Sequence, residues 1–204
     1  MKGRFIDFLL SMLSVILGIV ITFAVQGMID RAADRREVRS ALELVRTELE
    51  TNRDDIATMT GYLAQEREAA QYFIDHRGDL AACPADTVAL LGGLLFADAS
   101  ISVSSDALEL LKNSALFPKI GNNLLSMQII RAYDTGSTIS LLLNRHVSAR
   151  DERFEPTESF LGSEAGQQAL RWLISQADPV SLADLSDIDA ALEAVDNYLH
   201  GKKR

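Results

Sequence analysis

The chain is poor in the residues that build disulfides and metal sites. Cys83 is its only cysteine, which excludes an intramolecular disulfide and any cysteine-rich metal site. The three histidines, His76, His146 and His200, lie in separate segments and lack the spacing of metal ligands. We therefore expect no bound metal. Because no neighbouring base activates Cys83, we interpret it as a small apolar side chain rather than a nucleophile.

Motifs for catalysis and nucleotide binding are also missing. Gly92-Gly93 is not followed by the Lys-Ser pair of a phosphate-binding loop, and the chain holds neither Gly-x-Ser-x-Gly nor Ser-x-x-Lys. Acidic neighbours such as Asp54-Asp55 fit a solvated helix face better than a general acid–base pair. Arg131 and Tyr133 interrupt an apolar stretch, and we expect them to make structural hydrogen bonds. We therefore expect no cofactor and no enzymatic activity.

Clusters of basic residues are scarce as well. The formal net charge of the chain is −9, and the acidic residues lie almost entirely after residue 29. Binding to the phosphates of nucleic acid requires clustered Lys and Arg, so we expect no nucleic-acid partner. The same charge argues against a domain that lies flat on anionic lipid.

One long uncharged run stands near the N-terminus, from Phe8 to Ile29. Its 22 residues would form a helix of about 33 Å, which is enough to cross the hydrocarbon core of a bilayer. A cleaved signal peptide is the alternative, but its apolar core would be shorter, and Gln26 fits poorly before a cleavage site. We expect residues 1–29 to be a short tail and transmembrane anchor, followed by a helical domain over 30–201 and a basic tail at 202–204.

Basic residues flank the anchor on both sides. Lys2 and Arg4 precede it, and the following segment carries Arg31, Arg35, Arg36 and Arg39. The numbers are nearly balanced, and long domains cross membranes largely regardless of such residues. We expect the domain to lie outside the cytoplasm.

Small and polar residues recur every four positions within the anchor. Ser14, Gly18, Thr22 and Gln26 form one slanting stripe on a helix. Small residues allow two helix backbones to approach closely, and Ser, Thr and Gln can hydrogen-bond across the contact. We predict that this face docks a second transmembrane helix, either from another copy of the chain or from a partner membrane protein; the alternative is that scattered small residues are simply tolerated in the span.

After the anchor the sequence has a regular helical pattern without proline until Pro84. Apolar residues, together with Asn52 and Glu66, alternate in spacings of four and three: Val38, Leu42, Val45, Leu49, Asn52, Ile56, Met59, Leu63, Glu66, Ala70 and Phe73. This core stripe predicts one helix over 30–76, continuous with the anchor. A homomeric coiled coil and an intramolecular bundle share this spacing, and we favour the bundle because the rest of the chain supplies further apolar helices.

Further helices are expected at 85–97, 105–114, 122–150, 163–177 and 186–200. Ser105 is a candidate cap for the second of these, and Ser186 with Asp189 resembles a capping box that opens the last. Gly136 is expected to interrupt the helix over 122–150. Strand signals are weak, so the fold class is all-α, with the long helix packed in an antiparallel helical bundle.

Three segments carry a resemblance to a known family. They are VILGIVITFAVQ in the anchor, ELETN at 48–52 and SSDALELLKNSALFPKIGNNLLSMQIIRAYD at 104–134. These resemble an uncharacterised family of small bacterial single-pass membrane proteins, in which a spanning helix runs into a long helix. The chain departs from the family in having Ala115 where glycine is usual. The resemblance implies this architecture and a location in the bacterial inner membrane, and it implies no known activity.

Two functional hypotheses follow. The first is a membrane-tethered interaction or scaffold module, whose partners are the bilayer and either a second copy or another membrane protein. The second is a ligand-sensing helical bundle coupled to the membrane helix. We favour the first, because at most seven residues precede the span and could receive a signal.

Overall fold

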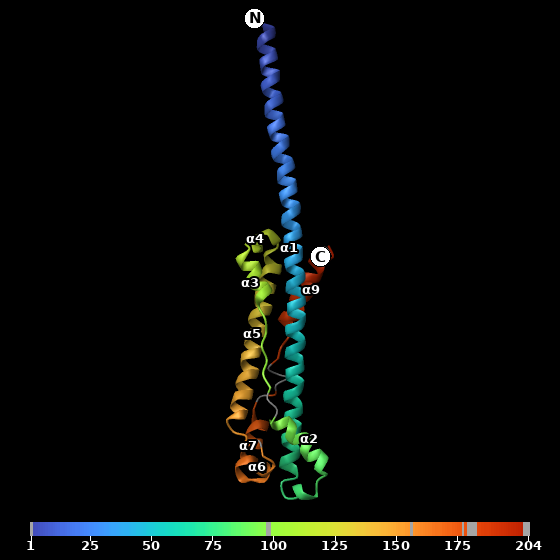
Figure 1. Ribbon diagram of the computed structural model, residues 1–204, viewed down its shortest axis with the longest axis vertical. Helices are drawn as coiled ribbons and strands as arrows, with labels where there is room; N and C mark the ends of the chain where they lie inside the picture. The colour runs from blue at the N-terminus through green and yellow to red at the C-terminus, as the bar shows by residue number, and fades with distance from the viewer. Residues whose placement is uncertain (1, 97–98, 156, 177, 179–182, 202–204) are drawn as a thin grey trace.

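The computed structural model describes residues 2–96, 99–155, 157–176, 178 and 183–201, and within these it is helical without a strand. The side chains of 2–11, 13, 14 and 158 lie outside this description. So do two predicted helix ends, Ala97 and Ala177, and the basic tail at 202–204. Figure 1 shows a compact group of helices around the lower part of one long rod, whose N-terminal part stands clear of the rest.

The rod is helix α1, which runs without a break from Lys2 to Asp75 over 74 residues. Proline is absent from it, so no backbone donor is missing along its length. Exposed pairs four residues apart add local support, with Arg39 Nε 3.3 Å from Glu43 and Arg46 Nε 3.1 Å from Glu50. The expected continuity of the anchor segment with the long helix is thus confirmed.

The remaining elements pack along the C-terminal half of α1. They are a 3-10 turn at Leu80–Ala82, α2 (Ala85–Phe96), α3 (Asp106–Asn113), α4 (Phe117–Ile120), α5 (Asn123–Asp151), α6 (Glu158–Gly162), α7 (Glu164–Ser175) and α9 (Ser186–Leu199). An extended segment over 99–105 joins the two ends of the domain. It carries the chain from α2, far from the N-terminus, back to α3 and α4 (Figure 1).

Because the extended segment over 99–105 carries the chain back toward the N-terminal end of the domain, α5 starts there and runs in the same direction as α1. Lys119 of α4 pairs with Asp34, and within α5 Tyr133 contacts Glu48 and Arg150 contacts Glu66, so residue numbers rise together along α1 and the segment from α4 through α5.

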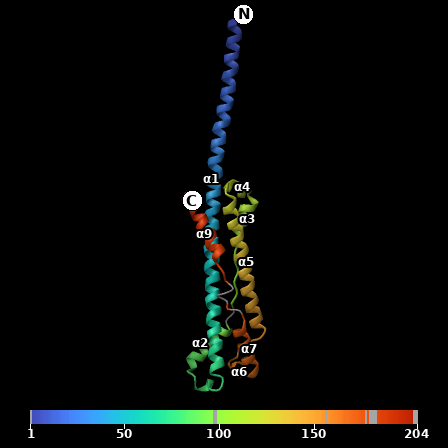
Figure 2. The ribbon, with the colours of Figure 1, turned by 180° about the vertical axis from the view of Figure 1, so that it is seen from behind.

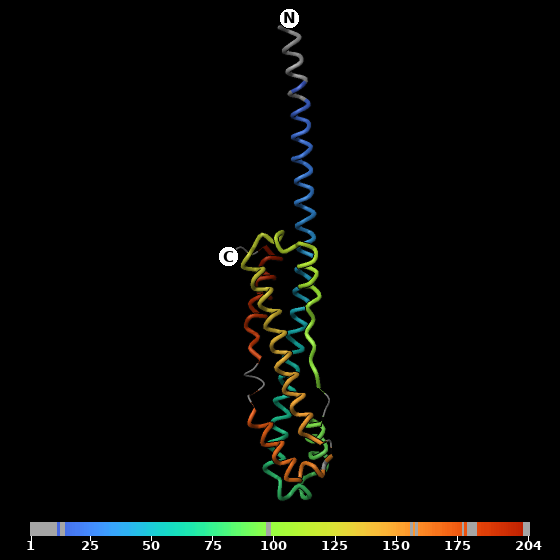
Figure 3. Tube along the Cα trace, turned by 90° about the vertical axis from the view of Figure 1, so that its left-hand side faces the viewer, coloured from blue at the N-terminus to red at the C-terminus, as the bar shows by residue number. Residues whose placement is uncertain are grey.

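Helix α9 runs the opposite way, since Asp189 pairs with Arg53 and Asp196 with Arg46. The expected antiparallel bundle is therefore not confirmed as stated: α9 runs against α1 while α5 runs with it, as Figures 2 and 3 show.

The core stripe faces inward throughout. All eleven of its residues, from Val38 to Phe73, are buried, including the polar Asn52 and Glu66. Its first two-thirds pack against α3, α5 and α9, and its last third packs with α2 and α7 around Phe73, Leu95 and Leu170. The stripe is therefore the shared wall of an intramolecular core.

Two local predictions were wrong. Gly136 does not interrupt α5, since it lies buried within the helix, where a Cβ would meet Ile188 at 3.8 Å. The last helix does not open on a capping box at Ser186. Instead, the Asp184 carboxylate accepts from Ser186 N at 3.0 Å, and this hydrogen bond lowers the pKa of Asp184.

At two positions in the domain, the space around the backbone or its conformation restricts which residue fits. At the corner between α6 and α7, a Cβ on Gly166 would stand 1.9 Å from the carbonyl oxygen of Phe160, so only glycine fits. After α3, Ala115 has φ = 53°, in the left-handed region. It closes a Schellman motif in which Leu116 N donates to Leu111 O at 3.2 Å and Ala115 N donates to Lys112 O at 3.4 Å.

Candidate functional site

The predicted docking face lies on the part of α1 that no other described element covers. Thr22 Oγ1 donates to Gly18 O at 2.8 Å, and Gln26 Nε2 donates to Asp30 Oδ1 at 2.9 Å. The side chain of Ser14 lies outside the described residues. In the described chain α1 alone is long and apolar enough to cross a membrane, and none of its apolar window is buried. Docking through this face stays a prediction.

In the domain, polar side chains gather first around Glu48. Its carboxylate accepts from Ser104 Oγ at 2.6 Å, from Ala107 N at 3.1 Å and from Tyr133 Oη at 2.7 Å. A carboxylate at the N-terminus of α3 satisfies a free backbone donor and favours the helix dipole. Burial, with the carboxylate beside it, raises the pKa of Tyr133. The expected structural hydrogen bond of Tyr133 is confirmed, whereas Ser105 makes no side-chain cap.

Two asparagines hold the extended segment between α1 and α5. Asn52 accepts from Ser104 N at 2.9 Å and donates to Ser104 O at 2.8 Å. Asn144 does the same for Ile101, at 3.0 Å and 2.7 Å. Each asparagine side-chain amide hydrogen-bonds with both the backbone N–H and the backbone C=O of one residue, as a neighbouring strand would. Glu48 and Asn52 both belong to the segment 48–52, and Ser104 and Tyr133 contact them from the segment 104–134.

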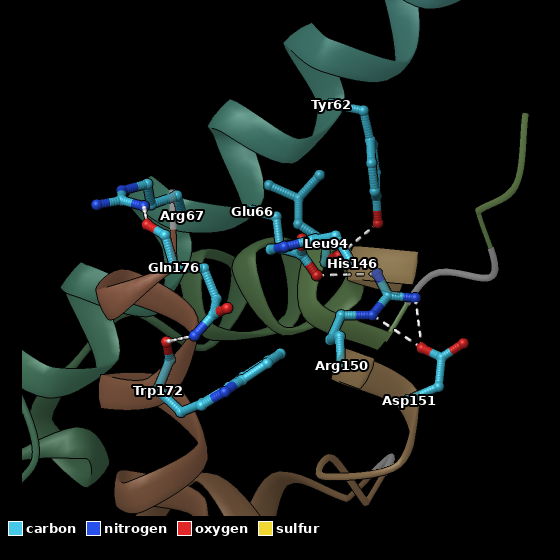
Figure 4. A network of polar contacts seen from close by, with 9 residues as sticks. All are labelled: Tyr62, Glu66, Arg67, Leu94, His146, Arg150, Asp151, Trp172 and Gln176. Carbon is cyan, nitrogen blue, oxygen red and sulfur yellow. Dashed lines mark hydrogen bonds and ion pairs between the residues drawn. The ribbon is translucent and has the colours of Figure 1, made fainter. Parts of the chain in front are cut away.

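A second group of polar side chains lies in the half of the domain that is far from the N-terminus (Figure 4). Glu66 on α1 and Arg150 on α5 have side chains that are 0% and 1% exposed, and Arg150 Nη1 lies 2.8 Å from Glu66 Oε1. Asp151 Oδ1 also accepts from Arg150, at 2.6 Å. Burial opposes the charge of the guanidinium, but the two carboxylates outweigh it, so the pKa of Arg150 lies above its usual value.

Aromatic contacts connect the Glu66–Arg150 ion pair with α7. His146 Nε2 lies 3.7 Å from Glu66 Oε2, and its ring stacks at 6.3 Å on Trp172. The guanidinium of Arg153 sits 4.3 Å from the centroid of the same indole. On the other side of α7, Arg67 Nη1 donates to Gln176 O at 2.8 Å. Together these contacts tie α1, α5 and α7 to one another.

The polar residues around Glu48 and those around Glu66 make their contacts with other residues of the same chain. Each of these carboxylates faces a cation or a hydrogen-bond donor of the same chain. Among the described residues no group of three or more His, Cys, Asp or Glu side chains is placed to hold a metal ion. Sequence reasoning identified Asn52, Glu66 and Tyr133, but it missed Asn144 and Arg150, for which the sequence offers no local signal.

Two of the hollows on the described surface lie beside α1. One, of about 540 Å³, lies between α1 and the extended segment and is lined in part by Asp55, Thr58 and Tyr62. The other, of about 310 Å³, is a mainly apolar groove between α1 and α3. Its lining residues are Leu44, Thr47, Glu48, Asp106, Ala107 and Leu110. Arg131 and His146 line neither hollow, and Arg131 is exposed on α5.

Comparison with known proteins returned no family model, curated protein or solved structure that matches this chain.

Proposed function

We propose that this protein is a single-pass membrane protein in which the N-terminal part of α1 spans the bilayer and the helical domain serves as an interaction or scaffold module. One observation carries the proposal. Within a single unbroken helix, the large apolar residues from Val15 to Ile29 are exposed, while from Val38 onward the apolar residues of the core stripe are buried. One helix therefore carries an apolar surface that the domain leaves exposed and an apolar stripe that the domain buries.

The exposed stretch needs a cover that the described chain does not supply. Phe23 is 73% exposed and Met28 is 69% exposed, with no charged residue between Val15 and Ile29. Water disfavours such a surface by about 25 cal/mol for each Å² of apolar area, whereas lipid tails accept it. The helix also satisfies its own backbone donors and acceptors, which a lipid environment requires.

The polar residues of the domain support the scaffold role, because they hold its elements together. Glu48, Asn52, Glu66 and Arg150 are engaged in holding α1 to α3, α5 and the extended segment. A domain whose polar residues are used to hold its own helices together suits the presentation of a surface to another protein. We place it in the inner membrane of a bacterium, with the domain on the extracytoplasmic side.

A ligand-sensing role is the second candidate, and the hollow beside Tyr62 favours it. Asp55, Thr58 and Tyr62 present a carboxylate and two hydroxyl groups on the helix that continues toward the membrane. A small molecule bound there would contact both α1 and the extended segment. Thermal unfolding of the full chain against a library of small polar metabolites tests this role: a shift that Asp55→Ala abolishes would favour sensing over scaffolding.

The membrane proposal is tested by fractionation and by reporter fusions. The full chain should stay with membranes after washing in alkaline carbonate and dissolve only in detergent; release by carbonate would refute the anchor. Paired fusions at the C-terminus, one active only in the cytoplasm and one only outside it, determine the side. A signal from the cytoplasmic reporter alone would overturn the expected orientation.

A further inference from the structure

We propose that two copies of this chain pair side by side, in parallel, through one continuous face of α1 that runs from the membrane helix into the domain. We call this face the outer stripe; its residues are Thr22, Gln26, Ser40, Leu44, Thr47 and Thr51. The inference rests on the proposed membrane anchoring, since a shared bilayer orients both copies the same way.

The unbroken helix fixes the relation between the two halves of the stripe. Eighteen residues make about five turns of an α-helix, so residues 18 apart lie on the same side. Thr22 and Ser40 are related in this way, and so are Gln26 and Leu44. All four are exposed. The predicted docking face of the anchor is therefore in line with an uncovered face of the domain, roughly opposite the core stripe.

The domain half of the stripe has a shape that fits its own copy. Leu44 is 51% exposed and projects beside the apolar groove between α1 and α3, whose far wall carries Leu110 at 44% exposure. The protruding side chain and the groove thus occupy the same face. A twofold axis parallel to α1 places each Leu44 in the groove of the other copy, which makes the contact self-complementary.

The polar residues of the stripe do not oppose close approach. Thr22 Oγ1 donates to Gly18 O at 2.8 Å, Thr47 Oγ1 to Glu43 O at 3.1 Å, and Thr51 Oγ1 to Thr47 O at 3.0 Å. Each of these three threonine hydroxyls is satisfied within the helix, which leaves the threonine methyl groups free to face a second helix. A Cβ on Gly18 would meet nothing within 4 Å. Such a face suits backbone-to-backbone packing in a bilayer.

Arg36 and Glu37, at the two edges of the stripe, favour a second copy. Arg36 and Glu37 are about 100° apart around the helix, and the stripe passes between them. In a parallel twofold pair, Arg36 of each copy approaches Glu37 of the other. Arg36 makes no ion pair with a described residue, and Glu37 has only Lys119, at 3.6 Å. The stripe ends at Asp54 and Asp55, where like charges would face each other.

Thiol cross-linking tests the pairing in native membranes. The single cysteine is first removed as Cys83→Ser, and Leu44→Cys is then treated with a short bis-maleimide. Arg39→Cys is the matched control, because it is exposed at a similar height but about 140° away around the helix. We expect cross-linked dimer from Leu44→Cys and little from Arg39→Cys. Equal yields at the two positions, or none at either, would overturn the proposal.

A second pair of variants tests the continuity of the stripe. In the Leu44→Cys chain, Gly18→Leu adds bulk to the anchor face, whereas Ala24→Leu adds it about 160° from Thr22. Because α1 is unbroken, we expect Gly18→Leu to reduce cross-linking at position 44 roughly tenfold, which corresponds to about 1.4 kcal/mol, and Ala24→Leu to leave it unchanged. Equal effects of both variants would refute a continuous seam.

Failure of the pairing and failure of the anchor give different results. A chain that alkaline carbonate releases from membranes lacks the anchor. A chain that stays in the membrane but shows no dimer, by cross-linking or by its mass in lipid nanodiscs, retains the anchor and contradicts the pairing.

Discussion

Ala115→Gly should stabilise the protein, because it relieves the one non-glycine residue with positive φ in the described chain. Ala115 has φ = 53°, where the Cβ of an L-residue crowds the backbone. It is held there by the two hydrogen bonds of the Schellman motif and by the burial of Leu111 and Leu116 on either side of it. These contacts fix the turn, so the residue cannot relax to a more favourable conformation.

The magnitude follows from two opposing terms. A non-glycine residue in the left-handed region is disfavoured by about 1–2 kcal/mol. Glycine loses about 0.5–1 kcal/mol more backbone entropy on folding than alanine does. The net gain is therefore about 0–1.5 kcal/mol with a central value of about 0.75 kcal/mol, or roughly 1.5–3 °C in Tm for a chain of this size.

Urea unfolding of the full chain in detergent, followed by circular dichroism, measures this difference. Asn113→Gly is the control, since residue 113 is exposed within α3 and has a negative φ, so glycine there should destabilise by up to about 1 kcal/mol. Opposite signs for the two variants are expected. If Ala115→Gly also destabilised, the backbone at 115 would not be left-handed and the reasoning would fail.

Three further predictions concern the domain. Gly166→Ala should destabilise by more than about 2 kcal/mol in the same assay, because the new Cβ overlaps a backbone carbonyl, whereas Gly93→Ala, where nothing lies within 4 Å, should be neutral or stabilising. Arg150→Met should destabilise by about 3–5 kcal/mol, because it removes the guanidinium from the buried Glu66 and leaves only His146 nearby, at 3.7 Å; adding Glu66→Met should restore much of the loss, and a double variant no better than the single would contradict this account. The pKa of Tyr133 is raised by folding, so its contribution to stability is complete below pH 10 and is lost as the pH rises further, by up to about 1.4 kcal/mol per pH unit. Unfolding at pH 9 and pH 11 should show a larger loss in the wild type than in Tyr133→Phe, in which Tyr62, whose pKa burial also raises, still titrates.

Local periodicity was sufficient to predict the long helix and the wall of the core. Every residue of the core stripe is buried, because side chains at alternating spacings of three and four share one face of a helix whatever packs against it. The need of Asn52 and Glu66 for partners also follows from that stripe alone, since a buried polar group without a hydrogen bond is unfavourable.

The identity of those partners could not be predicted from the sequence. Arg150 lies 84 residues after Glu66, and Ser104 lies 52 residues after Asn52. The cap of α3 comes from Glu48 on another helix, although the local rule pointed to Ser105. The direction of α5 depends on the extended return over 99–105, which no helical period indicates. Such contacts arise from tertiary packing and leave no local trace.

The order of residues along the chain has a consequence for synthesis. The core stripe is complete at Phe73, but Arg150, which pairs with Glu66, is added 84 residues after it. At about 5–20 residues per second, Glu66 waits roughly 4–17 s for its cation, and the stripe waits longer still for α9. Under the proposed anchoring, the nascent helix is held at the membrane during that interval while its apolar face is uncovered. A chaperone or the bilayer surface would then have to protect this face until α5 and α9 are made.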